Sequence, residues 1–233
     1  MRIDFHTHIL PKIDDGSSSV EESIQLLTME SQQGVETVVL TPHFYPQEDR
    51  PERFLQRRQR SYEKLLESLN ENNKIPHIIL GAEVYYFNGI SDWSGLKDMR
   101  IGDTKYVLVE MPMEKWTDRM YDELDGIYRK QGLIPVVAHL DRYINMFNVN
   151  GVVSRLQEIN VIVQANASFF MDKKRLALKL LKNNVINIVG SDCHNTDNRK
   201  PNLQQAKEVI LQNLGQEYIY CINKTGERIL SEK

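Results

Sequence analysis

The stretch Arg2-Ile-Asp-Phe-His-Thr-His8 joins a short apolar run to two histidines, His6 and His8. Residues two apart on an extended segment point to the same side, so both imidazoles can reach one ion. His-x-His is a short motif, and two partly buried histidines satisfied by backbone carbonyls would give the same pattern. The rest of the sequence bears on this choice, because other apolar runs end in similar residues.

Six further histidines and acids follow apolar, strand-like runs elsewhere in the sequence. They are His43, Glu83, Glu110, His139, Asp192 and His194. A lone histidine such as His43 is often structural. A carboxylate at the end of an apolar strand needs a cation or a basic partner. Salt bridges to lysine or arginine are therefore the alternative to metal binding for Glu83 and Glu110. Scattered core residues would not all choose the same end of their strands, so the pattern indicates one shared site.

The first loop carries the acidic turn Asp14-Asp-Gly16. An ordinary turn is one interpretation, because Asp and Gly are turn residues. An acid a few residues after two imidazoles is also well placed to bind a neighbouring ion. Of the two acids, Asp15 is the predicted ligand.

Strands and helices alternate along the chain. Strands are predicted at 2–5, 37–41, 77–80, 106–110, 134–138, 161–165 and 185–190, and helices at 19–33, 51–70, 118–131, 152–158, 173–182 and 203–214. Apolar strands without strict alternation are typical of parallel sheets covered on both faces. We therefore predict an α/β chain, a distorted, TIM-like β/α barrel of about seven parallel strands, as one domain over residues 1–233. An open sheet is the alternative.

The secondary structure of two regions is less clear from the sequence. Residues 86–103 are the least regular part, and the segment after Glu217 is expected to add a further short strand. In a β/α barrel, catalytic residues lie at the C-terminal ends of the strands, where the histidines and acids of this chain are found.

Bulk properties exclude several classes of protein. The chain has 233 residues and a formal net charge of −3, so nucleic acid is not an expected partner. The densest basic stretch, Arg57-Arg58-Gln59-Arg60, is expected to form a solvated helix face. Two cysteines, Cys193 and Cys221, give no disulfide framework, which favours a reducing, cytoplasmic location. Neither a signal peptide nor a membrane span is expected, and an oligomer is compatible with the sequence.

The combined set of nine candidate ligands exceeds what one ion uses. The set is His6, His8, Asp15, His43, Glu83, Glu110, His139, Asp192 and His194. Mixed imidazole and carboxylate ligands suit Mn, Fe or Zn, and the lack of thiolates argues against a structural zinc site. Two or three ions about 3.5–4 Å apart could lower the pKa of bound water to about 7 and hold phosphate oxygens. Arg142 and Arg199 are candidate phosphate clamps, with surface ion pairs as the alternative.

These motifs resemble the polymerase and histidinol phosphatase (PHP) family. The matching motifs are Asp4-Phe-His-Thr-His8, Thr41-Pro-His43, Gly81-Ala-Glu83, Val109-Glu110, Ala138-His139 and Gly190-Ser-Asp-Cys-His194. Within this family the chain is similar to the bacterial CpsB/YwqE-type capsular and exopolysaccharide tyrosine-protein phosphatases. Its additional matches include Ile9-Leu-Pro, Asp14-Asp-Gly16, His139-Leu-Asp-Arg-Tyr143, Gln164-Ala-Asn-Ala-Ser168 and Arg199.

The resemblance implies a distorted seven-stranded barrel with a trinuclear metal centre, often manganese or iron. It implies hydrolysis of phosphotyrosine by metal-activated hydroxide, without a cysteine nucleophile. The expected substrate is the tyrosine-rich tail of a kinase that controls polysaccharide export. By motif match, the nine residues above would be ligands, and Arg142 and Arg199 would hold the phosphate. The chain departs from the family pattern at His139-Leu-Asp-Arg142, where His-Pro-Glu-Arg is expected, and in residues 44–50.

Other functions remain open at this point. A small-molecule phosphomonoesterase such as a histidinol phosphatase would use the same site. A non-catalytic metal-binding or kinase-docking module would bind metal without turnover. A nuclease or polymerase-accessory role is weaker, because the chain is acidic and has no basic stripe.

Overall fold

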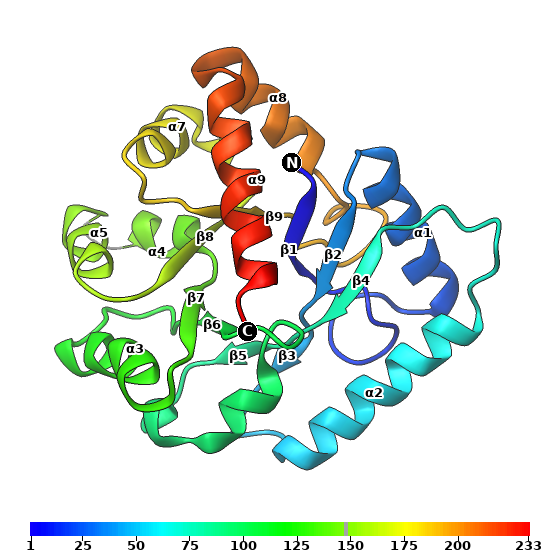
Figure 1. Ribbon diagram of the computed structural model, residues 1–233, viewed down its shortest axis with the longest axis horizontal. Coiled ribbons are helices and arrows are strands. Elements are labelled where there is room, and N and C mark those ends of the chain that lie inside the picture. Colours follow the sequence, from blue (N-terminus) through cyan, green and yellow to red (C-terminus); the bar gives the residue numbers. More distant parts are fainter. Residues whose placement is uncertain (147–148) are drawn as a thin grey trace.

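A parallel β-sheet curls around the centre of the protein, and helices cover its outside (Figure 1). The computed structural model describes residues 1–146 and 149–233. The strands in these parts are β1 (Ile3–Thr7), β2 (Thr37–Leu40), β3 (His43–Phe44), β4 (His77–Leu80), β5 (Glu83–Tyr85), β6 (Tyr106–Glu110), β7 (Ile134–Val137), β8 (Ile162–Asn166) and β9 (Ile188–Gly190). They pair in the orders β1-β2-β4 and β3-β5-β6-β7-β8-β9, and every pair is parallel.

The two sheets continue into one another. Strands β2 and β3 follow each other across Thr41-Pro42, and β4 and β5 across Gly81-Ala82. Gly81 N donates to Leu40 O at 2.8 Å, and Glu83 N donates to Pro42 O at 3.0 Å. Pro42 has no N–H to donate to the ladder. The described residues therefore contain nine short strands where about seven were predicted, because two of the predicted strands are interrupted and continue.

The curl brings β1 beside the segment that follows β9. Asp192 N donates to His6 O at 2.8 Å, and His8 N donates to Cys193 O at 2.9 Å. Residues from the two ends of the sequence thus meet at one edge of the sheet. This contact positions the first and last of the predicted ligands side by side.

Helices connect most of the strands. They are α1 (Val20–Gln32), α2 (Pro51–Glu67), α3 (Asp118–Gln131), α4 (Leu140–Met146), α5 (Val149–Gln157), α6 (Phe169–Asp172), α7 (Lys174–Lys182), α8 (Leu203–Leu214) and α9 (Gln216–Ser231). The least regular predicted region holds two short 3-10 helices, Ile90–Asp92 and Ser94–Met99.

Local sequence signals explain several helix ends. Ser19 caps α1, because its side chain accepts a hydrogen bond from Glu22 N at 3.1 Å. Gly132 ends α3 with φ 69°, a left-handed conformation that glycine adopts without a Cβ clash. The predicted helices at these places are confirmed.

The prediction of a short strand after Glu217 is wrong, because α9 covers this segment. Helix α9 lies across the front of β1 and β9 in Figure 1. Gly226 permits this contact: a Cβ there would lie 2.9 Å from Phe5 Cε2. Ile229 of α9 is buried in the same apolar cluster as Phe5. Packing against the sheet, rather than the β propensity of the segment, determines its structure.

Two apolar clusters form the core. The larger lies between the sheet and the surrounding helices. The smaller includes Phe5, Val39, Tyr106, Val136 and Ile188, one residue from each of five strands, and is covered by α9. Burial of this cluster at one end leaves the opposite end of the curled sheet for polar side chains.

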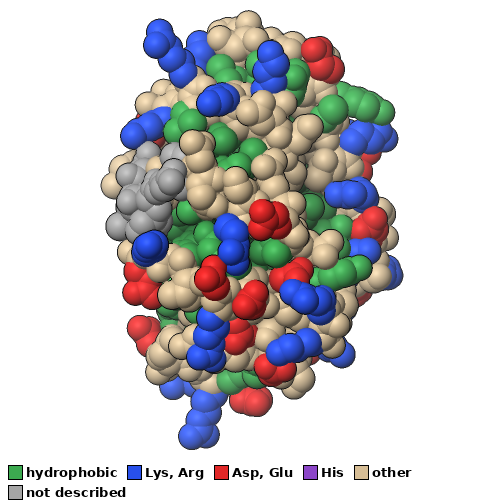
Figure 2. Space-filling view, turned by 90° about the vertical axis from the view of Figure 1, so that its left-hand side faces the viewer, with side chains coloured by type: hydrophobic (Ala, Val, Ile, Leu, Met, Phe, Trp, Pro, Cys, Tyr) green, Lys and Arg blue, Asp and Glu red, His purple; other side chains and the backbone are tan. Residues whose placement is uncertain are grey.

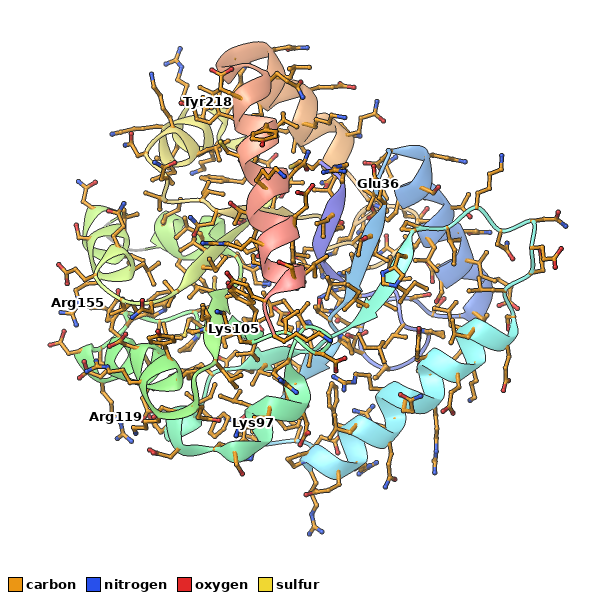
Figure 3. All side chains as sticks on the ribbon, in the orientation of Figure 1. Glu36, Lys97, Lys105, Arg119, Arg155 and Tyr218 are labelled. Carbon is orange, nitrogen blue, oxygen red and sulfur yellow. The ribbon has the colours of Figure 1, made fainter. Side chains whose placement is uncertain are left out.

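Charged side chains lie around the outside of this core. Arg119 in α3 and Arg155 in α5 point outward in Figure 3. Acidic and basic groups are interspersed over the face seen in Figure 2. Within residues 1–146 and 149–233, none of the helices has both the length and the apolar character needed to cross a membrane.

Candidate metal centre

Glu83 lies at the centre of a cluster of imidazoles and is fully buried. Its Oε2 atom is 3.1 Å from His6 Nε2 and 3.3 Å from His8 Nε2. The same atom is 2.9 Å from His43 Nδ1, and Oε1 is 2.7 Å from His139 Nε2. One carboxylate from β5 therefore faces four histidines from three other segments of the sheet.

The structure brings all nine predicted ligands together in four overlapping groups. These are His8, Asp15, His43 and His194; His6, His139 and Asp192; His6, His8 and Glu83; and His43, Glu83 and Glu110. Within each group the possible ligand atoms lie within 4.8 Å of one another. Four residues, His6, His8, His43 and Glu83, occur in two groups each. Shared ligands of this kind suit closely spaced ions rather than one isolated ion.

Unsatisfied buried atoms give an independent test of this fit. His43 Nδ1, Glu83 Oε2, Asp192 Oδ1 and His194 Nε2 are buried, and none of them has a partner with hydrogen-bond geometry in the described structure, although the first two atoms lie 2.9 Å apart. Such atoms cost free energy unless another group compensates them. Each belongs to a group with ligand spacing. Cations held by these atoms would satisfy them, so the residues fit a metal centre.

The pKa values of the cluster acids are shifted in opposite directions. Although burial raises the pKa of Glu83, the charges of His6 and His139 outweigh burial and hold that pKa well below its usual value. Burial and the charge of Glu83 raise the pKa of Glu110. Burial also opposes ionisation of Asp192, but His139 and His8 hold its pKa well below normal. Two carboxylates at the centre are therefore ionised and available as ligands.

The histidines also differ. Burial lowers the pKa of His194 to about 3, and the nearby charge of His8 adds to this effect. Burial lowers the pKa of His8 as well, but Asp14 outweighs it, and the net shift is well above the usual value. A neutral imidazole such as His194 can ligate directly, whereas His8 must release a proton when a cation binds.

Asp14 orients His8 from outside the cluster, a role that the sequence analysis missed. Its Oδ2 is 2.8 Å from His8 Nδ1 and accepts from His43 N at 3.0 Å. Asp15 faces the cluster, with Oδ1 3.4 Å from His194 Nε2 and 3.5 Å from His43 Nε2. Carboxylate partners on the second ring nitrogen fix the tautomer of a ligating histidine. In the sequence, only the adjacency of Asp14 to the predicted ligand Asp15 indicated that Asp14 has a role at this site.

Gln164 and Asn166 at the end of β8 support His139. Gln164 Oε1 accepts from His139 N at 2.9 Å, and Asn166 Oδ1 is 3.0 Å from His139 Nδ1. Asn166 Nδ2 also donates to Asp192 Oδ2 at 3.1 Å. Their position at a strand end and their place in the motif Gln164-Ala-Asn-Ala-Ser168 were the sequence signals for this role. Together they connect two candidate ligands through one hydrogen-bonded network.

The backbone is strained at two candidate ligands. His139 has φ 54° and Asp192 has φ 55°, both in the left-handed region that residues with a Cβ rarely adopt. Strain of this kind persists only where surrounding contacts enforce it, and it clusters at functional sites. The backbone at β7 and β9 thus turns immediately after each strand and directs these side chains to the cluster.

Arg142 and Arg199 lie at the rim of the cluster. Each donates from its Nη2 atom to Asp192 Oδ2 at 2.9 Å, and Arg142 Nη1 donates to Glu110 Oε1 at 3.1 Å. The arginines are about one third exposed, with 32% and 37% of the side chain accessible. The ion pairs are thus with candidate ligands rather than with surface acids. Guanidinium groups at this position can also face a bound anion.

Cys193 does not have the environment of a nucleophile. It is fully buried, and its Sγ lies 3.8 Å from Glu30 Oε1. Burial and the charge of Glu30 raise the pKa of its thiol well above the usual value. A thiol that stays protonated is a poor nucleophile. The chemistry of this site therefore depends on the histidines and acids.

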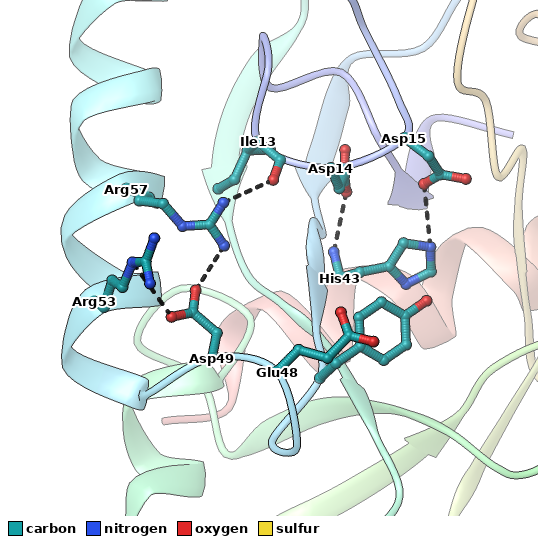
Figure 4. Close-up of a pocket in the computed structure, with 9 residues that line it drawn as sticks. Ile13, Asp14, Asp15, His43, Glu48, Asp49, Arg53 and Arg57 are labelled. Atoms are coloured by element: carbon teal, nitrogen blue, oxygen red, sulfur yellow. Dashed lines mark hydrogen bonds and ion pairs between the residues drawn. The ribbon is translucent and has the colours of Figure 1, made fainter.

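An open pocket of about 520 Å³ adjoins the cluster (Figure 4). Asp15 and His43 line it, together with Tyr45, whose ring stacks on His43 with centroids 5.1 Å apart. Arg57 reaches it from α2 and binds Asp49 Oδ2 at 2.7 Å and Ile13 O at 3.0 Å. Of the basic stretch expected on a solvated helix face, Gln59 and Arg60 are exposed, whereas Arg57 is partly exposed and is also held by acceptors in two loops.

Comparisons with known proteins agree with this geometry. The family model for capsular polysaccharide synthesis, CpsB/CapC, matches residues 2–230. Tyrosine-protein phosphatase CpsB of Streptococcus pneumoniae is 32% identical over 230 residues, covering 91% of each chain. Tyrosine-protein phosphatase YwqE of Bacillus subtilis (strain 168) is 28% identical over 238 residues, covering 98% of this chain and 91% of that protein.

A solved structure gives the same result at the level of the fold. It comes from crystal structures of YwqE from Bacillus subtilis and CpsB from Streptococcus pneumoniae, described as unique metal-dependent tyrosine phosphatases. The TM-score is 0.85 at 26% identity, over 99% of this chain and 95% of that chain. The similarity extends over the whole curled sheet and its helices.

Proposed function

Because this chain belongs to the CpsB/CapC family of capsular polysaccharide synthesis proteins, we propose that it hydrolyses phosphotyrosine in a protein substrate. The chain is a metal-dependent phosphomonoester hydrolase of the protein-tyrosine-phosphatase type. The single observation that carries the proposal is the convergence of five histidines and four acids on one buried site. The fold alone does not require such a costly set of groups, so they indicate a functional site.

We propose that all nine residues act as ligands and that they hold two to three ions, most simply manganese, with iron or zinc as alternatives. Four overlapping groups support more than one ion, and the oxygen and nitrogen donors suit these metals. When bound, such ions activate water for attack on phosphorus and neutralise phosphoryl charge. Glu83 belongs to two of the groups and would contribute ligand atoms to both.

The protein side chains have separate tasks in this scheme. Arg142 and Arg199 would bind the phosphoryl oxygens, because each guanidinium has five N–H donors and uses only some of them on the cluster acids. Asp14 and Asn166 hold the rings of His8 and His139 in fixed orientations. Preorganised groups of this kind contribute to catalysis because they need not move during the reaction.

We further propose that the substrate is the phosphorylated tail of a tyrosine kinase that controls capsule or exopolysaccharide synthesis, encountered in the cytoplasm. The names of the relatives and the description of the family support this context. The interspersed charges on the face in Figure 2 give no reason to expect nucleic acid. Residues 1–233 would form a single catalytic domain, because the ligands extend from His6 to His194.

One experiment tests the proposal directly. The purified protein is assayed for metal content and then for phosphate release from a phosphotyrosine peptide, a phosphoserine peptide and histidinol phosphate. We expect two to three equivalents of metal and a clear preference for phosphotyrosine. Preference for histidinol phosphate would identify a small-molecule phosphatase instead. Bound metal with no hydrolysis of any of the three would identify a binding module.

A further inference from the structure

A second, basic pocket lies beside the one that adjoins the metal centre. It has a volume of about 440 Å³ and lies between the loop around Lys12 and helix α2. Its charged lining consists of four basic residues and a single acid, namely Lys12, Arg57, Arg60, Lys64 and Glu21. The whole chain has a net charge of −3, so this positive charge is a local feature.

Most of these basic groups are available to a ligand. Lys12, Arg60 and Lys64 are exposed. Across residues 1–146 and 149–233, none of the three forms an ion pair with a carboxylate. Cations on a helix surface are usually near acids, as Lys130 is to Asp92. Lys12 lies near enough to Glu21 for its charge to lower the pKa of that acid, but three exposed cations face this single acid around the pocket. Together they attract an anion more strongly than any one of them would alone.

The basic pocket adjoins the pocket of the metal centre. Ile13 and Arg57 line both of them. Arg57 is fixed between them by its bonds to Asp49 and to Ile13 O. An extended peptide that reaches the metal centre through the first pocket would meet the basic pocket next.

We infer that the basic pocket binds an acidic side chain of the substrate peptide, a few residues from the phosphotyrosine. This inference rests on the proposed function, because it assigns the second pocket to the same peptide. A pocket of 520 Å³ treated as a sphere is ~10 Å across, which about three extended residues at ~3.3 Å each would span. The acidic group is therefore expected about three residues from the phosphotyrosine, and either a carboxylate or a phosphoryl group supplies the charge.

The test uses two sets of three phosphotyrosine peptides. The peptides of one set differ only at the position three residues before the phosphotyrosine, and those of the other set differ only at the position three residues after it. In each set this position holds alanine, glutamate or phosphoserine. The wild-type protein is compared with the double variant Arg60→Ala/Lys64→Ala, which removes two exposed cations from the pocket and leaves the metal centre intact. The peptide with dephosphorylated tyrosine is quantified by mass spectrometry at low ionic strength, and kcat/KM is obtained from its rate of formation.

The matched control is Lys174→Ala/Arg175→Ala on α7. It also removes one lysine and one arginine, both exposed, and α7 lies on the opposite side of the molecule from α2 in Figure 1. Both double variants therefore change the net charge equally. Any effect of overall charge on peptide encounter is common to both, and a difference between them reports on the pocket.

We expect the wild type to prefer at least one acidic peptide over the alanine peptide by about five- to tenfold, because two or three screened charge pairs contribute. Arg60→Ala/Lys64→Ala should lose this preference while its activity on the alanine peptide is unchanged, and the control should keep it. Preference for phosphoserine alone would identify a phosphoryl group as the ligand. The inference is overturned if the wild type has no preference, if the pocket variant keeps it, or if both variants lose it equally.

Binding of fluorescein-labelled, non-hydrolysed peptides is measured in parallel by anisotropy. The same loss of preference should appear in Kd. If no phosphotyrosine peptide is hydrolysed, the proposed function fails, and the anisotropy experiment still tests the basic pocket. Equal Kd values for the alanine and acidic peptides would then refute the pocket on its own terms.

Discussion

Replacement of Glu83 by glutamine should remove more than one metal ion from the centre. Glu83 is fully buried and belongs to two of the four candidate groups, with His6 and His8 in one and with His43 and Glu110 in the other. The substitution keeps the shape of the side chain but removes the negative charge that faces these histidines. A single change should therefore weaken two neighbouring ion sites.

The magnitude follows from linkage between metal binding and folding. An ion at 100 times its Kd stabilises the folded state by ~2.7 kcal/mol. For a chain of 233 residues, about 1 kcal/mol shifts Tm by ~2–4 °C, so each ion should raise Tm by ~5–10 °C. If Glu83→Gln disables two ion sites, the metal-induced rise in Tm should be smaller than that of the wild type by ~10–20 °C. Turnover should fall by ~10²–10³-fold or more, because a preorganised charge is lost.

The assay is differential scanning calorimetry of each protein with EDTA and with excess Mn²⁺, together with elemental analysis. Comparing the two conditions within each variant cancels any effect of the substitution on the metal-free fold. Glu48→Gln is the matched control, because Glu48 is an exposed acid of the adjoining pocket and belongs to none of the four groups. A Glu83→Gln protein with wild-type metal content, the same rise in Tm and normal turnover would refute the central role of this carboxylate.

Three further predictions concern the rim, the thiol and the metal-free protein. Arg142→Ala should raise the inhibition constant of inorganic phosphate by ~10-fold or more, because a charge-assisted contact is lost, and an unchanged constant would exclude the clamp role. Cys193→Ser should retain turnover at matched metal content, since the thiol is buried and protonated; an inactive variant with normal metal would reopen a thiol mechanism. In EDTA, Tm should fall as pH rises above 6.5. The reason is that Asp14 holds the pKa of His8 above 6.5 in the folded state. The resulting stabilisation of the fold is complete below pH 6.5 and is lost at higher pH. Calorimetry between pH 6 and 9 should show this slope in the wild type, and a slope of the same size in Asp14→Asn would contradict the pairing.

The end-of-strand positions were predictable because burial and charge conflict there. A run such as Tyr106–Glu110 is wholly buried, and only its last residue is charged. A sequence that places a carboxylate in such a position must compensate it, which indicates a partner without any knowledge of the fold. The boundaries of α3 and α8 were equally clear, because glycines mark their ends.

The support around the ligands was not predictable in the same way. Asp14 and Asp15 are adjacent in one turn, and only the path of the loop places Asp14 behind His8 and Asp15 in front of it. Gln164 and Asn166 are uncharged, so no imbalance in the sequence required a partner for them. Hydrogen bonds between distant segments depend on tertiary structure, which local patterns do not encode.

Helix α9 shows how a short window can mislead. The residues Tyr218-Ile-Tyr-Cys-Ile222 have strong β propensity and led to the predicted strand. The buried positions of the whole segment are Ile219, Ile222, Gly226 and Ile229, which recur at helical spacing. The pattern becomes visible only when the glycine is counted as a contact residue. It is one because Phe5 leaves no space for a Cβ.

The strained backbone at His139 and Asp192 connects the fold to the proposed chemistry. Each residue is the second after its strand, and each adopts a positive φ that costs of order 1–3 kcal/mol for a residue with a Cβ. Glycine would remove the strain at either position but would also remove the ligand. Gln164 Oε1 accepts a hydrogen bond from His139 N, and Asn166 Nδ2 donates one to Asp192 Oδ2; these bonds help the fold to hold both residues in place. Sites of this kind contradict local backbone preference, and the conflict is explained if the side chains are required where the turn places them.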